Sequence, residues 1–132
     1  MDKVFKILIA DPNPYIRSFL SRELSVMGNT TVEAANCKEI FKLLKDGYQP
    51  DLIVIDLDFP LIKEMKVLKR IQNFVPTIPQ VIYSQLSEYE NHPCAEKADA
   101  FVDKSGDPIE LFQAINLVLQ KKHATCSNGT LC

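Results

Sequence analysis

Four polar residues stand at or just beyond the ends of short apolar runs, at positions where their side chains could do chemistry together. Asp56 closes the run Leu52-Ile53-Val54-Ile55, and Asp11, Ser84 and Lys104 follow three similar runs. Because the carboxyl ends of parallel strands lie at one edge of a sheet, we expect these side chains to share a shallow pocket. Two carboxylates bind a hard divalent cation, a lysine neutralises phosphoryl oxygens, and a serine hydroxyl donates a hydrogen bond. The sequence therefore predicts a phosphate-handling site with Asp56 as its reactive acid.

The elements that must position these residues alternate along the chain. Short apolar runs are followed by longer amphipathic ones, a pattern typical of strand-helix units that build a parallel sheet with helices on both faces. The fold class that we predict is therefore α/β. The predicted strands are Val4–Ala10, Thr31–Ala34, Leu52–Ile55, Gln80–Tyr83 and Ala100–Val102.

Helices are predicted between the strands from apolar spacing and capping residues. Asn13 and Asp107 are placed to cap the first and last helices, and Gly28 to end the first. We expect a short or irregular helix in the crossover 85–99, because Pro93 interrupts it. The predicted helices run from about Pro14 to Met27, from near Cys37 to Gly47, through Met65 to Ile71, and from about Pro108 to Lys122.

Length and charge limit the function classes. A chain of 132 residues with 46% hydrophobic content matches one globular domain, for which we predict residues 1–122, followed by a flexible tail at 123–132. A net charge of −2 with scattered charges argues against direct nucleic-acid binding.

The apolar run Val4–Ala10 is too short for a signal peptide or membrane span, so we expect a cytoplasmic protein. The dispersed cysteines predict free thiols, and the role of Cys126 and Cys132 is left open.

Several sequence words resemble the receiver domain of bacterial two-component response regulators. The resemblance covers about residues 3 to 121, and the order of the words makes it specific. It implies a doubly wound, flavodoxin-like (CheY-like) fold with a five-stranded parallel sheet, expected as a stand-alone domain. The matching words are Ile7-Leu8-Ile9-Ala10-Asp11, Arg17, the run from Pro50 to Pro60, Val81-Ile82-Tyr83-Ser84 and Phe101-Val102-Asp103-Lys104.

The resemblance implies a role for each matching residue. Asp56 is the expected phosphoacceptor, which takes a phosphoryl group from a sensor histidine kinase or phosphotransfer protein. Lys104 is the expected phosphate contact and Ser84 the switch hydroxyl. Phe101 stands at the position of an aromatic that changes rotamer with that hydroxyl, although a plain core role is an equal alternative.

The resemblance also implies a Mg²⁺ cofactor. Asp11, Asp56 and the backbone carbonyl of Asp58 match the metal ligands of the family. Pro12 stands where the family has a second acid. Because Mg²⁺ then loses one oxygen ligand, we predict weak binding of this metal.

Two function classes follow, and a third is weaker. In the first, phosphorylation of Asp56 reorganises a surface that contacts a downstream protein whose identity the sequence does not give. In the alternative, the chain is a phosphorylation-independent pseudo-receiver that binds proteins, a reading favoured by Pro12. A hydrolase with Asp56 as nucleophile is disfavoured, because no substrate pocket or lid is evident, and we expect no conventional enzyme. A homodimer through the last helix is left open, and we expect no direct nucleic-acid or membrane partner.

Overall fold

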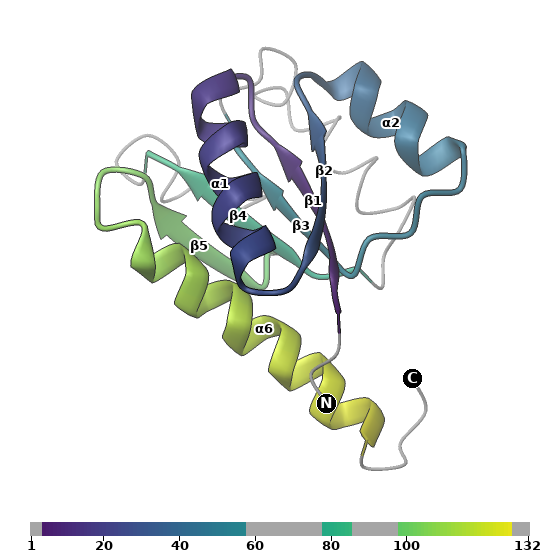
Figure 1. Ribbon diagram of the computed structural model, residues 1–132, viewed down its shortest axis with the longest axis vertical. Coiled ribbons are helices and arrows are strands. Elements are labelled where there is room, and N and C mark those ends of the chain that lie inside the picture. Colours follow the sequence, from purple (N-terminus) through teal and green to yellow (C-terminus); the bar gives the residue numbers. More distant parts are fainter. Residues whose placement is uncertain (1–3, 58–77, 86–97, 128–132) are drawn as a thin grey trace.

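Five parallel strands form the centre of the molecule in the order β2-β1-β3-β4-β5 (Figure 1). The computed structural model describes residues 4–57, 78–85 and 98–127, with side chains described as far as residue 122. Each predicted strand overlaps an observed one, which confirms the α/β fold class with a parallel sheet. The strands are β1 (Lys6–Ala10), β2 (Thr30–Ala34), β3 (Leu52–Ile55), β4 (Gln80–Ser84) and β5 (Ala100–Asp103).

The register of the strands determines which residues meet at the carboxyl edge of the sheet. Ala10 in β1 pairs with Ile55 in β3, so the residues that follow them, Asp11 and Asp56, leave the sheet side by side. Ser84 pairs with Asp103, so Lys104 emerges one residue later beside β4. From the centre of the sheet, β1 is followed by β2 on one side, and β3, β4 and β5 follow one another on the other side. In open parallel sheets of this kind, ligands bind beyond the carboxyl ends of the strands where the direction changes, here between β1 and β3.

Helices cover both faces of the sheet because successive strand side chains point to opposite sides. Ile7 and Ile9 of β1 pack into the core cluster that includes residues of α1 (Pro14–Val26) and α6 (Ile109–Ser127). Leu8 and Ala10 pack into the other cluster, with residues of α2 (Cys37–Lys45). Figure 1 shows α1 and α6 beside each other, and the rings of Phe19 and Phe112 lie 6.2 Å apart between their centroids. Each fully buried Leu or Ile contributes about 1.5–3 kcal/mol to this packing.

The start of α1 is capped as the sequence predicted. The side chain of Asn13 accepts a hydrogen bond of 2.9 Å from the backbone N–H of Tyr15, and Pro14 occupies the first turn. At the other end, Gly28 adopts a φ of 94°, a conformation that glycine adopts without strain. The cap at Asn13 fixes where α1 begins after the loop that contains Asp11, and Gly28 allows the chain to turn after the other end of the helix.

Helix α6 is longer than predicted. Its Asp107 cap is confirmed, because Oδ1 of this residue accepts a 3.0 Å hydrogen bond from the N–H of Ile109. The helix continues to Ser127, whereas we predicted an end near Lys122. The physical reason is that no glycine or proline interrupts the sequence between Pro108 and Gly129, so nothing breaks the helix at the predicted position. The boundary between the domain and a flexible tail stays a prediction.

Some predicted elements lie outside the described residues. These are the helix around Met65 to Ile71 and most of the crossover 85–99. None of the helices in the described part of the chain combines the length and the apolar character that a membrane span requires.

Candidate functional site

The backbones of the predicted site residues are held by the last hydrogen bonds of the sheet. The N–H of Asp11 donates to Ala34 O at 3.2 Å, and the N–H of Asp56 donates to Ala10 O at 3.0 Å. The N–H of Lys104 donates to Ser84 O at 2.9 Å. Each residue therefore leaves the sheet from a position that the neighbouring strand determines.

Lys104 joins the two acids. Its Nζ lies 2.7 Å from Asp11 Oδ2 and also forms an ion pair with Asp56 Oδ2. The Asp11 and Asp56 side chains are only 4% and 1% exposed, and that of Lys104 is 15% exposed. The structure thus brings together three of the predicted site residues in a largely buried cluster of two negative charges and one positive charge.

Ser84 completes the cluster. Its hydroxyl donates to Asp56 Oδ1 at 2.7 Å and accepts from the backbone N–H of Leu57, also at 2.7 Å. Ser84 is fully buried. The serine therefore links the carboxylate of Asp56 to the first backbone amide beyond it.

Asn13 contributes a contact that the sequence analysis did not identify. Its backbone N–H donates to Asp11 Oδ1 at 2.8 Å, while its side chain caps α1. An aspartate that accepts from the amide two residues later forms a typical turn, and the Asp-Pro-Asn-Pro sequence was the available signal. This bond orients the Asp11 carboxylate so that its other oxygen reaches Lys104.

Arg17 holds the same loop from the first helix. Its guanidinium NH1 donates to the carbonyl oxygen of Asp11 at 2.8 Å, and Nε lies 3.3 Å from Glu33 Oε1. The Arg17 side chain is 16% exposed. Arg17 is one of the residues on which the family resemblance rests, with no role expected for it, and in the structure its side chain fixes the backbone of Asp11.

Replacement of Arg17 by alanine is expected to lower the free energy of unfolding by about 1–2 kcal/mol, because a partly buried charge-assisted hydrogen bond is lost. Urea denaturation measures this loss. Arg22→Ala on the same helix is the matched control. The Arg22 side chain is 72% exposed and 3.9 Å from Glu23, so we expect a change within about 0.5 kcal/mol. Equal losses in the two variants would contradict a specific role for Arg17.

The electrostatics of the cluster keep Lys104 charged. Burial lowers the pKa of Lys104, but its hydrogen bonds with Asp11 and Asp56 outweigh this effect, so the pKa is raised. Burial raises the pKa of Asp11, although its contact with Lys104 opposes the rise. Nζ of Lys104 also lies 5.8 Å from the centroid of the Tyr83 ring, within the range of a cation–π contact. The pocket therefore holds a positive charge from several sides.

Phe101, Asp58 and Pro12, which the sequence also pointed to, take no part in the cluster of Asp11, Asp56, Ser84 and Lys104 as far as the structure describes them. Phe101 is partly buried and packs against the core cluster on the α2 side of the sheet, so its core role is observed and its rotamer switch stays a prediction. Asp58 lies outside the described residues. Pro12 is exposed beside Asp11, with no acid at its position.

The acids of this cluster fit a divalent cation. Asp11 and Asp56 direct one carboxylate oxygen each to a single cationic atom, Nζ of Lys104. Mg²⁺ is often bound by one or two carboxylates with several waters, so this pair is a sufficient protein contribution. Within residues 4–57, 78–85 and 98–127, no group of three or more His, Cys, Asp or Glu side chains is arranged to hold a metal. Among the described residues, Asp11 and Asp56 are therefore the two acids that would hold such an ion.

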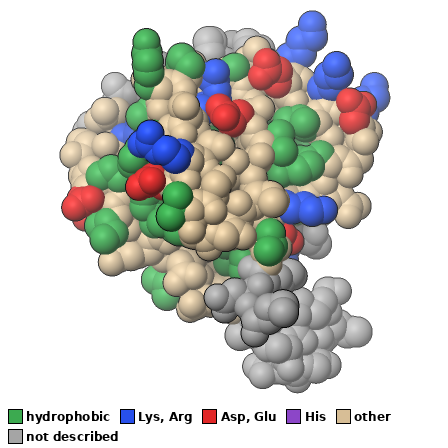
Figure 2. Space-filling view, viewed as in Figure 1, with side chains coloured by type: hydrophobic (Ala, Val, Ile, Leu, Met, Phe, Trp, Pro, Cys, Tyr) green, Lys and Arg blue, Asp and Glu red, His purple; other side chains and the backbone are tan. Residues whose placement is uncertain are grey.

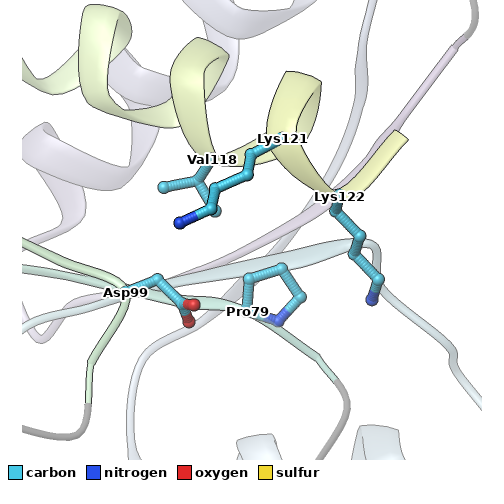
Figure 3. A pocket seen from close by; sticks show the side chains of 5 residues that line it. All are labelled: Pro79, Asp99, Val118, Lys121 and Lys122. Carbon is cyan, nitrogen blue, oxygen red and sulfur yellow. The ribbon is translucent and has the colours of Figure 1, made fainter. Parts of the chain in front are cut away.

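A separate cavity of about 310 Å³ lies at the opposite end of the sheet (Figure 3). Val118, Lys121 and Lys122 come from α6, and Pro79 and Asp99 from the segments that enter β4 and β5. None of the four predicted phosphate-handling residues lines this cavity. On the face shown in Figure 2, acidic and basic side chains are interspersed, so that face offers no basic surface of the kind that nucleic acids bind.

Comparison with curated proteins finds relatives at modest identity. The chain is 28% identical over 128 residues to the probable transcriptional regulator ycf27 of Porphyridium aerugineum, covering 96% of this chain and 52% of that protein. It is 27% identical over 122 residues to the Fimbriae Z protein of Escherichia coli K12, covering 89% of this chain and 57% of that protein. The chain thus spans about half the length of these relatives.

Solved structures share the fold, and a family model matches most of the chain. The response regulator TrrA of Thermotoga maritima, in complex with Mg²⁺-BeF, superposes with a TM-score of 0.76 at 27% identity, over 86% of this chain and 97% of that one. A CheY-like receiver domain of Methanospirillum hungatei has a TM-score of 0.82 at 20% identity, over 92% and 98% of the two chains, and confirms the fold. Residues 7–116 match the model of the response regulator receiver domain. The chain therefore belongs to the response regulator receiver domain family of two-component signalling.

Proposed function

We propose that this receiver takes a phosphoryl group on Asp56 from the phosphohistidine of a sensor kinase or phosphotransfer protein. A carboxylate oxygen of Asp56 attacks phosphorus, the P–N bond breaks with its electron pair left on the imidazole, and an acyl phosphate forms. The observation that supports this role is the joint contact of Ser84 and Lys104 with the Asp56 carboxylate. Both groups are already within reach of phosphoryl oxygens attached to that carboxylate.

The roles of the neighbouring groups follow from their positions. Lys104 needs to move only from a carboxylate oxygen of Asp56 to an oxygen of the phosphoryl group attached to that carboxylate, where its charge offsets the added negative charge. Ser84 donates to another phosphoryl oxygen. As the hydroxyl moves, it changes its hydrogen bond with the backbone amide of Leu57. A Mg²⁺ ion held by Asp11 and Asp56 would neutralise phosphoryl charge in the transition state. The negative charge added at Asp56 thereby shifts the conformation of a surface that a downstream protein contacts.

Intact-mass measurement after incubation with Mg²⁺ and a small phosphodonor tests this function. We expect the mass to increase by one phosphoryl group. Mg²⁺-BeF, which is bound in the related TrrA structure, provides a second probe because it mimics an acyl phosphate. No adduct and no response to this mimic would refute phosphorylation and support the alternative, a pseudo-receiver that binds proteins without it. The absence of a second acid at Pro12 is the observation that favours the alternative.

The pocket is proposed to bind Mg²⁺ weakly. Pro12 continues the loop after Asp11 without the additional carboxylate, and it is exposed, so its replacement disturbs no core packing. Pro12→Asp is expected to raise the Mg²⁺ affinity about tenfold, because the charge count of the ligands sets the affinity for hard cations. Calorimetric titration with Mg²⁺ measures the change.

Pro12→Asn is the matched control for this titration, since it removes the proline and adds a side chain of similar size without a charge. We expect its affinity to stay near that of the wild type. An equal gain in both variants would assign the effect to the proline ring and not to the missing acid. Tight saturating binding to the wild-type protein would contradict weak binding directly.

The surroundings of this receiver are part of the proposal. We propose a signalling module in the cytoplasm, not a conventional enzyme, that receives its signal from a histidine-containing partner and passes it to another protein. Direct nucleic-acid and membrane contacts are not proposed for the described domain. The net charge of −2 supports protein partners over nucleic acid.

A further inference from the structure

The cavity at the amino-terminal edge of the sheet lies between the second half of α6 and the segments that enter β4 and β5 (Figure 3). Its volume of about 310 Å³ corresponds to about ten water molecules at their volume in the liquid. Cavities that bind small molecules begin at about this size. The space therefore suits a small organic molecule better than a nucleotide or a peptide.

The wall formed by Pro79 and Asp99 is fixed by hydrogen bonds of the sheet. Pro79 is buried, and its carbonyl oxygen accepts from the N–H of Ile53 at 3.0 Å. Asp99 makes two bonds with Gln80. Its N–H donates to the Gln80 carbonyl oxygen at 2.8 Å, and its Oδ2 accepts from the Gln80 N–H, also at 2.8 Å. This wall is therefore formed before any ligand arrives, so binding requires little ordering of the chain there.

The opposite wall is the part of α6 that carries Val118, Lys121 and Lys122. The helix is anchored next to this wall, because Leu119 is 4% exposed and packs in the core. In Figure 3 the side chain of Lys121 extends toward the side on which Asp99 lies, and that of Lys122 extends past the other side of Pro79. Two ammonium groups from one helix thus border the same space.

The described lining combines a net positive charge with apolar surface. Lys121 and Lys122 supply two positive charges, and Asp99 supplies one negative charge. Pro79 and Val118 supply carbon surface. A ligand that matches both features has an anionic group for the lysines and a short apolar body. A single negative charge balances this lining, whereas a doubly charged phosphate ester would bring an unbalanced charge close to Asp99.

We propose that this cavity binds a small organic monocarboxylate, with the carboxylate at Lys121 and Lys122 and the apolar part against Pro79 and Val118. The site is separate from the phosphoryl chemistry proposed for Asp56, because it lies at the other edge of the sheet and shares no residue with it. Both lysines are exposed, so solvent screens part of the attraction. We therefore expect a dissociation constant on the order of 1 mM.

A titration with sodium benzoate, followed by amide NMR spectra of the nitrogen-labelled protein, tests the proposal. Benzoate joins one carboxylate to a small apolar ring. The buffer contains no Mg²⁺, and sodium chloride keeps the ionic strength constant, so a general salt effect does not contribute. We expect no shift at the amides of the phosphate-handling residues. Saturable shifts are expected at the amides of Gln80, Asp99, Val118, Lys121 and Lys122.

Two analogues of benzoate separate the charge from the apolar body. Benzyl alcohol keeps the ring and lacks the charge, and we expect it to bind at least about tenfold more weakly, because the charge-assisted hydrogen bonds are lost. Acetate keeps the carboxylate and lacks the ring, and we expect a similar loss from the missing apolar contact. Equal binding of benzyl alcohol and benzoate would overturn the anionic class of ligand. Equal binding of acetate would overturn the apolar contact.

Substitutions at the two lysines test the assignment of the carboxylate. Lys121→Gln and Lys122→Gln are each expected to weaken benzoate binding about threefold, and the double variant about tenfold. Both positions are exposed, so the fold should be retained. Lys42→Gln is the matched control, since Lys42 is exposed on α2, which packs on the other face of the sheet. Its affinity for benzoate should equal that of the wild type.

The proposal fails if benzoate gives no saturable shift up to about 20 mM, a concentration well above the expected dissociation constant. It also fails if the shifts appear at Asp11, Asp56 and Lys104 instead, or if the double variant binds benzoate as well as Lys42→Gln does. No phosphodonor and no metal enter this titration. The result is therefore independent of whether Asp56 accepts a phosphoryl group.

Discussion

Asp56→Asn is expected to abolish phosphoryl uptake completely and to leave the domain at least as stable as the wild type. The amide is not a nucleophile for phosphorus, so no acyl phosphate forms. Its loss of charge leaves Lys104 paired with Asp11 alone, one ammonium with one carboxylate. The Ser84 hydroxyl has two lone pairs and can reorient to accept from the new amide group. Intact mass and urea denaturation measure the two effects, and we expect a stability change between zero and a gain of about 1 kcal/mol.

Asp107→Asn provides the matched control, because it also converts an aspartate to its amide. Asp107 is exposed and caps α6, and asparagine caps helices as well as aspartate does. This variant should gain the same mass as the wild type and unfold at the same denaturant concentration. An adduct that survives Asp56→Asn would identify another acceptor residue. If Asp56→Asn lowers the free energy of unfolding by more than about 2 kcal/mol, the pocket has no excess of negative charge.

Ser84→Ala is expected to lower the free energy of unfolding by about 2–3 kcal/mol. The substitution removes one small group but breaks two buried hydrogen bonds, one to Asp56 Oδ1 and one from the amide of Leu57. Ser84 is fully buried, so water does not replace the missing hydroxyl without rearrangement. Urea denaturation measures the loss, with the slope of the unfolding free energy against urea concentration expected to be the same in the variant and the wild type.

Ser84→Thr separates the hydroxyl from the volume of the side chain, since threonine restores both hydrogen bonds and adds a methyl group. We expect it to recover most of the stability lost in the alanine variant. If Ser84→Ala unfolds within about 0.5 kcal/mol of the wild type, the two hydrogen bonds do not contribute as described. A threonine variant as unstable as the alanine variant would assign the loss to packing.

The positions of the site residues could be predicted from the sequence because they depend on strand periodicity. Apolar runs end directly before Asp11 and Asp56 and two residues before Lys104, and a parallel sheet brings such ends to one edge whatever the details of packing. The pairing of Ala10 with Ile55 realises this expectation residue by residue. The caps at Asn13 and Asp107 were predictable for the same reason, since they require only local spacing.

The contacts inside the pocket could not be predicted, because they depend on rotamers and on backbone positions that no spacing encodes. The expected contact of Lys104 with a phosphoryl group stays a prediction, and no spacing in the sequence indicated that Nζ joins both acids. The Arg17 contact with the carbonyl of Asp11 crosses from a helix to a loop, and a long flexible side chain leaves no periodic signal for it. The end of α6 was misjudged because composition suggested a break where the backbone had no breaker.

The anchoring of Asp11, Asp56 and Lys104 by the last bonds of the sheet has a consequence for timing. A shift of these backbones breaks at least one hydrogen bond at the end of the sheet. A change of side-chain rotamer breaks none of these backbone bonds. We therefore expect a chemical change at Asp56 to move the side chains of Ser84 and Lys104 before it moves the strands.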